Sequence, residues 1–138
     1  MAAFVLDSSV TAAFLFADEQ TQATATLLAR VEAEGVVVPA IWALETANML
    51  RRGERRRRLT AAGCAEGVLV LSRLPLRVEP MDLGRALGPV LDLASQHTLT
   101  SCDASYLELA LRHDLPLATR GQDLMRAATA EGVLLLPA

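Results

Sequence analysis

The sequence predicts an α/β domain whose parallel sheet is covered by helices on both faces. Short apolar runs alternate along the chain with longer segments that have the spacing of amphipathic helices. Strands that alternate with helices in this way pair in parallel, and the intervening helices pack on the sheet. Five apolar runs are candidate strands, at residues 3–6, 36–38, 76–78, 115–118 and 133–136.

The composition supports one domain over residues 1–138 with a sizeable core. Hydrophobic residues make up 52% of the chain and aromatic residues only 4%, so the core must consist of Leu, Val and Ala. No apolar run reaches the roughly 18 residues of a membrane helix, and the chain meets Asp7 too early for a signal peptide. Two cysteines are too few for a disulfide framework or a zinc site. We therefore expect a soluble protein of the reducing cytoplasm.

The first strand, residues 3–6, stops at a carboxylate. Asp7 and two hydroxyl residues follow it, and a short apolar helix is predicted at residues 8–16. Asp7 would therefore lie at the carboxyl edge of the sheet, where open α/β proteins bind their ligands. Capping of the helix by Asp7 or Ser8 explains the same pattern equally well.

The next two helices follow from their apolar spacing. Residues 21–34 form an amphipathic pattern with Ala25, Leu28 and either Leu27 or Val31 facing inward, and a glycine ends it. Residues 41–52 form a third helix, and Gly53 is predicted to break or turn the chain after it.

The second half of the chain holds the remaining helices. Thr60 is the expected cap of one, and Thr100 or Ser101 of another. Pro89 either sits in the first turn of a helix that ends near His97 or kinks a longer helix from about Leu83. The helix that Thr60 caps is predicted over residues 60–72, and the helix after Thr100 is predicted to end at about residue 113. A final helix is predicted over residues 122–130.

Two helices carry an acid on their apolar stripe. Glu45 shares a face with Ile41 and Met49 by helical spacing, and Asp103 aligns with Leu107 in the same way. Asp103 also fits a first-turn acid that favours the helix dipole, and Glu45 fits a salt-bridge partner at the edge of the stripe. The other acids are expected on the surface, namely Glu32, Glu34, Glu66 and Glu108.

Together, Asp7, Glu45 and Asp103 predict a cation site. Carboxylates that converge to ~5 Å repel by about 3 kcal/mol per pair at an effective dielectric of 20, whereas a typical fold is stable by only about 5–15 kcal/mol. All thirteen basic residues are arginine, so no lysine is present to relieve that repulsion. A ligand set made only of oxygens suits Mg²⁺, with Mn²⁺ as the other possibility.

Four stretches carry a family resemblance: residues 5–10 (VLDSSV), 38–48 (VPAIWALETAN), 99–107 (LTSCDASYL) and 115–119 (LPLAT). In this order and spacing they resemble PIN-domain ribonucleases, and more narrowly the VapC toxins of bacterial and archaeal type II toxin–antitoxin systems. The resemblance runs the full length of the chain. It implies a PIN-like three-layer α/β/α fold with a central, mostly parallel sheet of four to five strands.

The resemblance also implies an activity. It implies an Mg²⁺-dependent endoribonuclease that hydrolyses RNA phosphodiester bonds with a metal-activated water held by Asp7, Glu45 and Asp103. The supporting small polar positions would be Ser9, Thr100 and Thr119.

One position departs from the family pattern. A fourth acid is common two residues after the threonine that corresponds to Thr119, and Gly121 stands there. Asp123 could reach a second metal ion directly or through water, or it could be an ordinary first-turn helix acid. The number of metal ions therefore stays open. A PIN nuclease of RNA maturation without an antitoxin, and a catalytically inactive binding module, are the alternative functions.

Two further features concern partners. Residues 51–58 contain six arginines and one glutamate in a chain of net charge −3, which fits either RNA binding or a solvated helix end. The resemblance implies a VapB-like antitoxin whose C-terminal segment lies in a groove, and it implies a homodimer. Apolar side chains that could line that groove, or simply pack in the core, are Phe14, Phe16, Leu27, Trp42 and Leu50.

The remaining reactive side chains are expected to be structural. His97 and His113 fall at helix C-termini, where an imidazolium is favourable. Cys102 and Tyr106 are expected to pack without a catalytic role.

Overall fold

The computed structural model describes residues 3–138, and its core is a four-stranded parallel sheet. Val5 of the central strand pairs with Val37 on one side and with Leu117 on the other. This confirms the predicted α/β fold with a parallel sheet. In spatial order the strands are β3 (Leu76–Glu79), β2 (Val36–Pro39), β1 (Val5–Leu6) and β4 (Leu117–Ala118).

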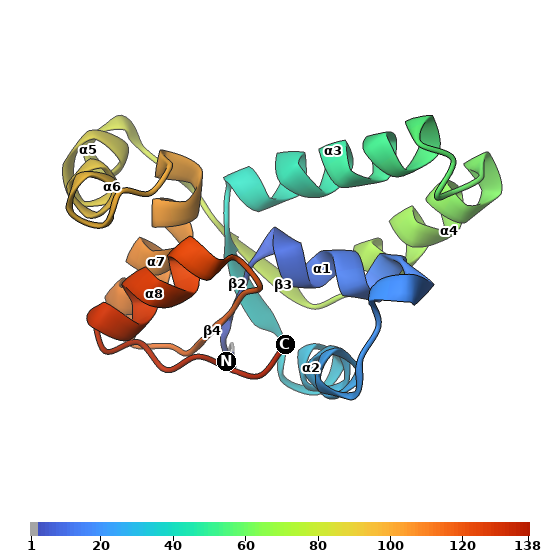
Figure 1. The fold of residues 1–138 in the computed structure, drawn as a ribbon, viewed down its shortest axis with the longest axis horizontal. Helices are drawn as coiled ribbons and strands as arrows, with labels where there is room; N and C mark the ends of the chain where they lie inside the picture. Colours follow the sequence, from blue (N-terminus) through green and yellow to red (C-terminus); the bar gives the residue numbers. More distant parts are fainter. Residues whose placement is uncertain (1–2) are drawn as a thin grey trace.

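Helices cover the sheet on both sides, which makes the three layers visible in Figure 1. Helix α7 contacts β1, β2 and β4 on one side, and α1 contacts α2 and α3 on the other. None of the helices within residues 3–138 is both long and apolar enough to cross a membrane. The helical elements are α1 (Ser8–Leu15), η1 (Ala17–Glu19), α2 (Gln22–Glu34), α3 (Ile41–Arg55), α4 (Ala61–Ser72), α5 (Leu83–Arg85), η2 (Ala86–Val90), α6 (Leu91–His97), α7 (Ser101–His113) and α8 (Gln122–Ala130).

Three helices begin at threonine caps. The hydroxyls of Thr60 and Thr100 accept hydrogen bonds from backbone N–H groups in the first turns of α4 and α7. Thr21 and Thr24 form a reciprocal capping box at the start of α2. The caps expected at Thr60 and Thr100 are confirmed, because a hydroxyl at this position satisfies a backbone donor that the helix leaves free.

The prediction that Gly53 breaks the third helix is wrong. Helix α3 continues to Arg55, and Gly53 is buried inside it. A β-carbon at this position would lie 3.0 Å from the side chains of both Leu59 and Phe16. The glycine therefore serves the close packing of the helix on its neighbours, and that benefit outweighs its low helix propensity.

The region around Pro89 follows the second of the two alternatives. Helical structure runs from Leu83 to His97, with one π-helical turn, η2, that contains Pro89. A proline inside a helix removes a hydrogen bond and clashes with the preceding turn, and a π-turn absorbs both effects.

The last predicted strand is reduced to a single bridge. Leu117 pairs in parallel with Leu135, and its N–H donates to the carbonyl of Leu134. The predicted strand at residues 115–118 is likewise shorter, at Leu117–Ala118. The sheet therefore has four strands and one additional bridge at its edge.

Two predictions of burial are also wrong. In helix α2 Ala25, predicted to face inward, is exposed, whereas Leu27 and Val31, the two alternatives for another inward position, are both buried. Glu108, expected on the surface, is 5% exposed. Its Oε1 accepts from Arg85 at 2.7 Å and Arg112 at 2.9 Å, and its Oε2 has no hydrogen-bond partner among residues 3–138. The two guanidinium groups compensate the buried charge.

Candidate metal centre

Asp7 lies directly after β1, at the carboxyl edge of the sheet, and is 5% exposed. Its side chain makes no capping hydrogen bond to α1 within the described residues, so capping does not account for this acid. Instead, its Oδ2 accepts hydrogen bonds from the hydroxyls of Ser9, at 2.7 Å, and Thr119, at 2.6 Å.

The two hydroxyls are themselves held in place by the backbone. The Ser9 Oγ accepts the N–H of Arg120 at 3.0 Å, and the Thr119 Oγ1 accepts the N–H of Gly121 at 3.0 Å. Because β1 and β4 are neighbours in the sheet, this network joins the ends of two strands. It orients one oxygen of Asp7. In the part of the chain that the structure describes, the other oxygen has only a long contact, 3.4 Å, to the hydroxyl of Ser8.

Glu45 reaches the same region from α3. Its Oε1 accepts hydrogen bonds from the hydroxyl of Tyr106 on α7 and from the hydroxyl of Ser8, the latter at 3.3 Å. Burial raises the pKa of Glu45, as do the carboxylates of Asp7 and Asp103, and the hydrogen bond from Tyr106 offsets part of the increase.

The predicted stripe of α3 is displaced by one position. The buried face of the helix consists of Trp42, Thr46, Leu50 and Gly53. Glu45 flanks that face, with Ile41 and Met49 also half-buried on its side. The indole N–H of Trp42 donates to the hydroxyl of Thr11 at 3.1 Å, which anchors the buried face on α1. Glu45 is therefore directed along the rim of the core and not into it.

Asp103 is the third acid, in the first turn of α7. Its backbone N–H donates to the hydroxyl of Thr100 at 3.1 Å, so Thr100 supports the cluster by capping this helix. Burial raises the pKa of Asp103, and so do the charges of Asp7 and Asp123. Asp7 thus raises the pKa of both of its acidic neighbours, which places all three carboxylates within electrostatic reach of one another.

Asp123 lies at the margin of this cluster. Its side chain is 67% exposed and pairs with Arg126 at 2.9 Å, as an ordinary first-turn acid of α8 does. It is nevertheless close enough to Asp103 to affect its pKa. Gly121 has a φ of −73°, and a β-carbon there would make only ordinary contacts, so the fold does not require glycine at this position.

The donor set fits a hard divalent cation in its chemistry. The acids offer only oxygen, and burial together with neighbouring carboxylates raises the pKa of Glu45 and of Asp103, as expected where no cation lies beside them. As the side chains stand, no group of three or more His, Cys, Asp or Glu residues within residues 3–138 is arranged to hold a metal ion. Which of these acids bind metal therefore stays a prediction.

Tyr106 is the site residue that sequence reasoning missed. It was expected only to pack, and its ring is fully buried, but its hydroxyl reaches Glu45. Burial and the Glu45 carboxylate raise the pKa of Tyr106, so it remains a protonated donor. Its position one turn after Asp103 on the same helix was the available signal, because residues three apart share a face.

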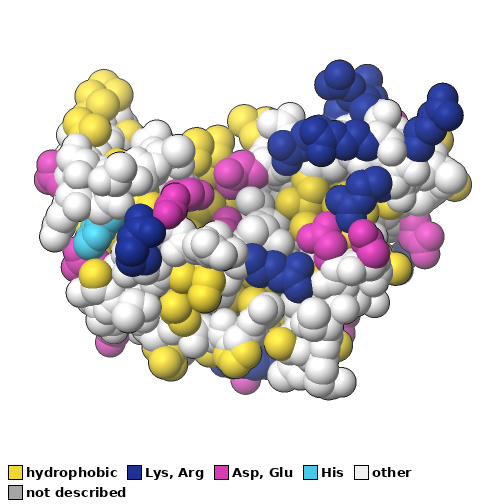
Figure 2. All heavy atoms as spheres, viewed as in Figure 1, with side chains coloured by type: hydrophobic (Ala, Val, Ile, Leu, Met, Phe, Trp, Pro, Cys, Tyr) yellow, Lys and Arg dark blue, Asp and Glu magenta, His cyan; other side chains and the backbone are white. Residues whose placement is uncertain are grey.

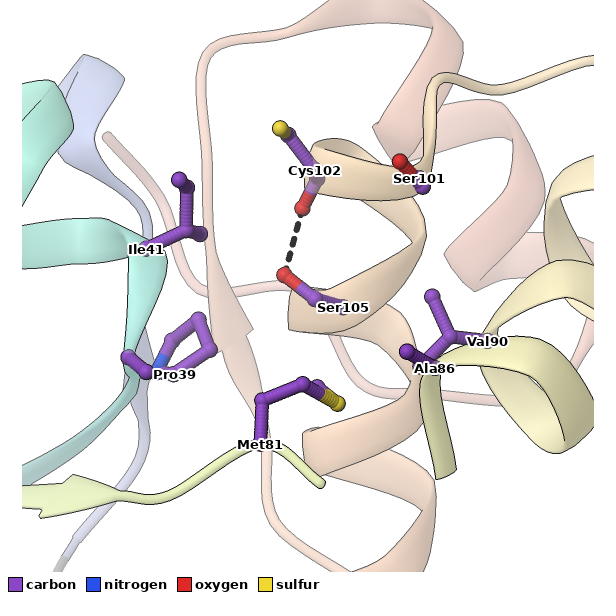
Figure 3. A pocket seen from close by; sticks show the side chains of 9 residues that line it. Pro39, Ile41, Met81, Ala86, Val90, Ser101, Cys102 and Ser105 are labelled. Atoms are coloured by element: carbon purple, nitrogen blue, oxygen red, sulfur yellow. Dashed lines mark hydrogen bonds between the residues drawn. The ribbon is translucent and has the colours of Figure 1, made fainter. Parts of the chain in front are cut away.

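An apolar hollow of about 160 Å³ adjoins the cluster (Figure 3). Its wall includes Ile41, one turn before Glu45, and Cys102, next to Asp103. Burial raises the pKa of the Cys102 thiol, as do Glu45 and Asp103, so the thiol stays protonated. In Figure 3 the other side chains around the hollow are Pro39, Met81, Ala86, Val90, Ser101 and Ser105.

The two histidines lie at helix ends, where the sequence predicts them, and each contacts a carboxylate. His97 pairs with Glu131 at 2.7 Å, and His113 pairs with Glu79 at 3.1 Å. Both lie in the last turns of their helices.

The protein is thus a parallel three-layer α/β domain with acidic side chains at the carboxyl edge of its sheet. The sequence matches the PIN domain family over residues 4–130, and the chain belongs to that family. PIN domains are generally Mg²⁺-dependent nucleases.

The fold is also similar to a solved structure. The crystal structure of PAE2754 from Pyrobaculum aerophilum superposes with a TM-score of 0.68 at 24% sequence identity, covering 91% of this chain and 79% of that one. None of the curated proteins matches this chain significantly.

Proposed function

We propose that the protein is an Mg²⁺-dependent endoribonuclease and the toxin component of a type II toxin–antitoxin system. The observation that carries the proposal is the position of Asp7, Glu45 and Asp103 near one edge of the sheet, where the Ser8 hydroxyl contacts both Asp7 and Glu45. They come from three elements far apart in the chain, yet Asp7 raises the pKa of the other two. A PIN domain that keeps such uncompensated charge is suited to bind a cation and an RNA phosphate.

In this proposal Asp7, Glu45 and Asp103 hold Mg²⁺, or Mn²⁺ in its place. When bound, the ion supplies a nucleophilic water at neutral pH and neutralises charge on the scissile phosphate. Ser9 and Thr119 orient Asp7 through two short hydrogen bonds, and Tyr106 fixes Glu45. Because Asp123 is exposed and already paired with Arg126, we assign it an outer role, through water or through its charge alone.

The toxin assignment includes two protein partners, a VapB-like antitoxin and a second copy of the chain. Phe14, Phe16, Leu27, Trp42 and Leu50 are all at most 9% exposed, which favours core packing for most of their surface. Phe14 and Leu50 still border a hollow of about 240 Å³ between α1, α3 and α4, where an apolar antitoxin segment could dock. Co-purification with the product of a neighbouring reading frame, and the mass in solution by light scattering, test these partners. We place the protein in the cytoplasm with its RNA substrate.

The test of the function is cleavage of a pool of transfer and ribosomal RNA by the purified protein. We expect discrete products with Mg²⁺ or Mn²⁺ and none with EDTA, because the acids alone supply no nucleophile. Folded protein, free of antitoxin, that cleaves nothing with any metal would contradict the proposal and favour the inactive binding module.

Replacing Tyr106 by Phe should shift the acid limb of the pH–activity profile to higher pH. The Tyr106 hydroxyl donates to the Glu45 carboxylate and favours its charged form, so its loss raises the pKa of Glu45 further. Below neutral pH we expect about a tenfold loss of cleavage, in the range of lost supporting contacts at metal sites. The profile is measured from pH 5 to 9, with unchanged melting at pH 9 as the control. A uniform loss at every pH would contradict this role.

A further inference from the structure

The arginine-rich segment at residues 51–58 does not act as one charged surface, because the structure gives its members different surroundings. Arg58 donates to Asp18 at 3.0 Å and to Glu19 at 2.9 Å, and it lies 4.0 Å above the ring of Phe16. Arg58 is therefore occupied in attaching this segment to η1.

Arg52 and Arg56 differ from Arg58 in both direction and pairing. They follow Glu45 by seven and eleven residues, which places them on the same face of α3 as Glu45. The Arg56 N–H still donates to the carbonyl of Arg52, so the helical spacing extends to this residue. The rise of the helix puts them about 10 and 16 Å along its axis from Glu45.

A hollow of about 310 Å³ lies beside this face of α3. Its lining includes Met49, Arg52 and Arg56, and also Phe16, Glu19 and Arg58. Glu19 is the only acid in this lining, and it is already paired with Arg58 and with Arg120. Arg52 and Arg56 make no ion pair within the described part of the chain, so the hollow is positively charged.

The view in Figure 2 puts this charge beside the acids. Arginine side chains gather over the C-terminal end of α3, and acidic side chains lie nearer the middle of the same face. Two neighbouring guanidinium groups without a counterion repel each other, and a phosphate between them relieves that repulsion through charge-assisted hydrogen bonds. The acids repel the backbone of an RNA strand everywhere except at a bound cation, so a positive site displaced along α3 determines the path of the strand.

We propose that Arg52 and Arg56 bind backbone phosphates of the substrate RNA strand, on one side of the bond that is cut, so that the strand runs along α3. This inference rests on the proposed nuclease function. The contacts are to phosphates, so the site contributes affinity and register without selecting a base sequence.

Arg51 and Arg55 provide a matched control. They belong to the same helix and carry the same charge, but they point roughly 80–120° away from Glu45 around the helix axis. Neither lines the hollow. Arg51 lies 3.8 Å from Glu54. Glutamine is a good helix former, so paired Arg-to-Gln substitutions should keep α3 intact.

The experiment compares R52Q/R56Q with R51Q/R55Q. Binding of a fluorescent single-stranded RNA oligonucleotide is measured by anisotropy without divalent metal, over a series of salt concentrations. We expect R52Q/R56Q to lose at least about tenfold in affinity at low salt. The plot of the logarithm of the association constant against the logarithm of the salt concentration has a negative slope. For R52Q/R56Q this slope should become shallower by about 1.4, since each phosphate contact contributes about 0.7 for single strands. R51Q/R55Q should change affinity less than about threefold, and both variants should melt as the wild type does.

Cleavage of the same RNA with Mg²⁺ separates this inference from the proposed function. We expect R52Q/R56Q to raise KM more than it lowers kcat. If the wild type cleaves RNA and both double variants lose affinity equally, or neither does, the inference is wrong and the nuclease remains. If the wild type does not cleave but the difference in salt slope is seen, the nuclease is wrong and the phosphate site remains. A wild type that neither binds nor cleaves RNA overturns both.

Discussion

Replacing Asp7 by Asn should reduce metal-dependent RNA cleavage by at least about 10³-fold. Asp7 is the most buried of the three acids, and its charge acts on both of the others. Loss of several kcal/mol of transition-state stabilisation at a metal site corresponds to this factor. Asparagine keeps the shape of the side chain, and its carbonyl oxygen can still accept from Ser9 and Thr119, so we expect the fold to remain.

The control for this prediction is D114N, the same substitution at the C-cap of α7, the end of that helix opposite to Asp103. Asp114 is exposed and has a φ of +53°, a conformation that asparagine tolerates. Cleavage rates of both variants are compared with Mg²⁺ and with Mn²⁺, and metal binding is followed by calorimetry. Near-normal cleavage by a folded D7N protein would remove Asp7 from the site.

Replacing Asp103 by Asn should stabilise the metal-free protein while it abolishes most of the activity. Burial, Asp7 and Asp123 raise the pKa of Asp103 above its ordinary value. Between the ordinary and the raised pKa the native state binds more protons than the unfolded state, so stability falls as pH rises through this window. At neutral pH the charged carboxylate therefore destabilises the metal-free fold, and the uncharged amide removes that penalty.

We expect a gain of about 1 kcal/mol, or about 3 °C in melting temperature, for D103N in EDTA at pH 7. The gap between D103N and the wild type should close as the pH falls below the ordinary pKa of the carboxyl. Added Mg²⁺ should raise the melting temperature of the wild type and have little effect on the variant, while RNA cleavage falls at least a hundredfold. A lower melting temperature for D103N at pH 7 would show that Asp103 is not repelled in the native state.

The sequence by itself determined most of the secondary structure and the class of fold. Helix α8 has the predicted bounds, Gln122–Ala130, and the caps at Thr60 and Thr100 are where expected. These features depend on residues within one turn of each other, where a hydroxyl or a proline acts directly on the nearby backbone. The alternation of apolar runs with helices was sufficient to predict a parallel sheet.

The tertiary structure alone decided which face of each helix is buried. On α3 both the stripe with Ile41 and Met49 and the stripe with Trp42 and Leu50 are apolar, and contact with α1 selects the second. Gly53 stays helical because Phe16 and Leu59 pack against it. A sequence pattern cannot separate such alternatives, because burial depends on which surface of the rest of the chain covers a residue.

The same division holds at the candidate site. The acids Asp7, Glu45 and Asp103 could be named from motifs in the sequence, because strand ends and first helical turns place such side chains at one edge of the sheet. Only the tertiary structure shows that Thr119 holds Asp7 across 112 residues and that Tyr106 holds Glu45 across 61. It also divides the arginines into Arg58, which is paired, and Arg52 and Arg56, which are not. Such contacts join residues that only the folded chain brings together, so no local pattern encodes them.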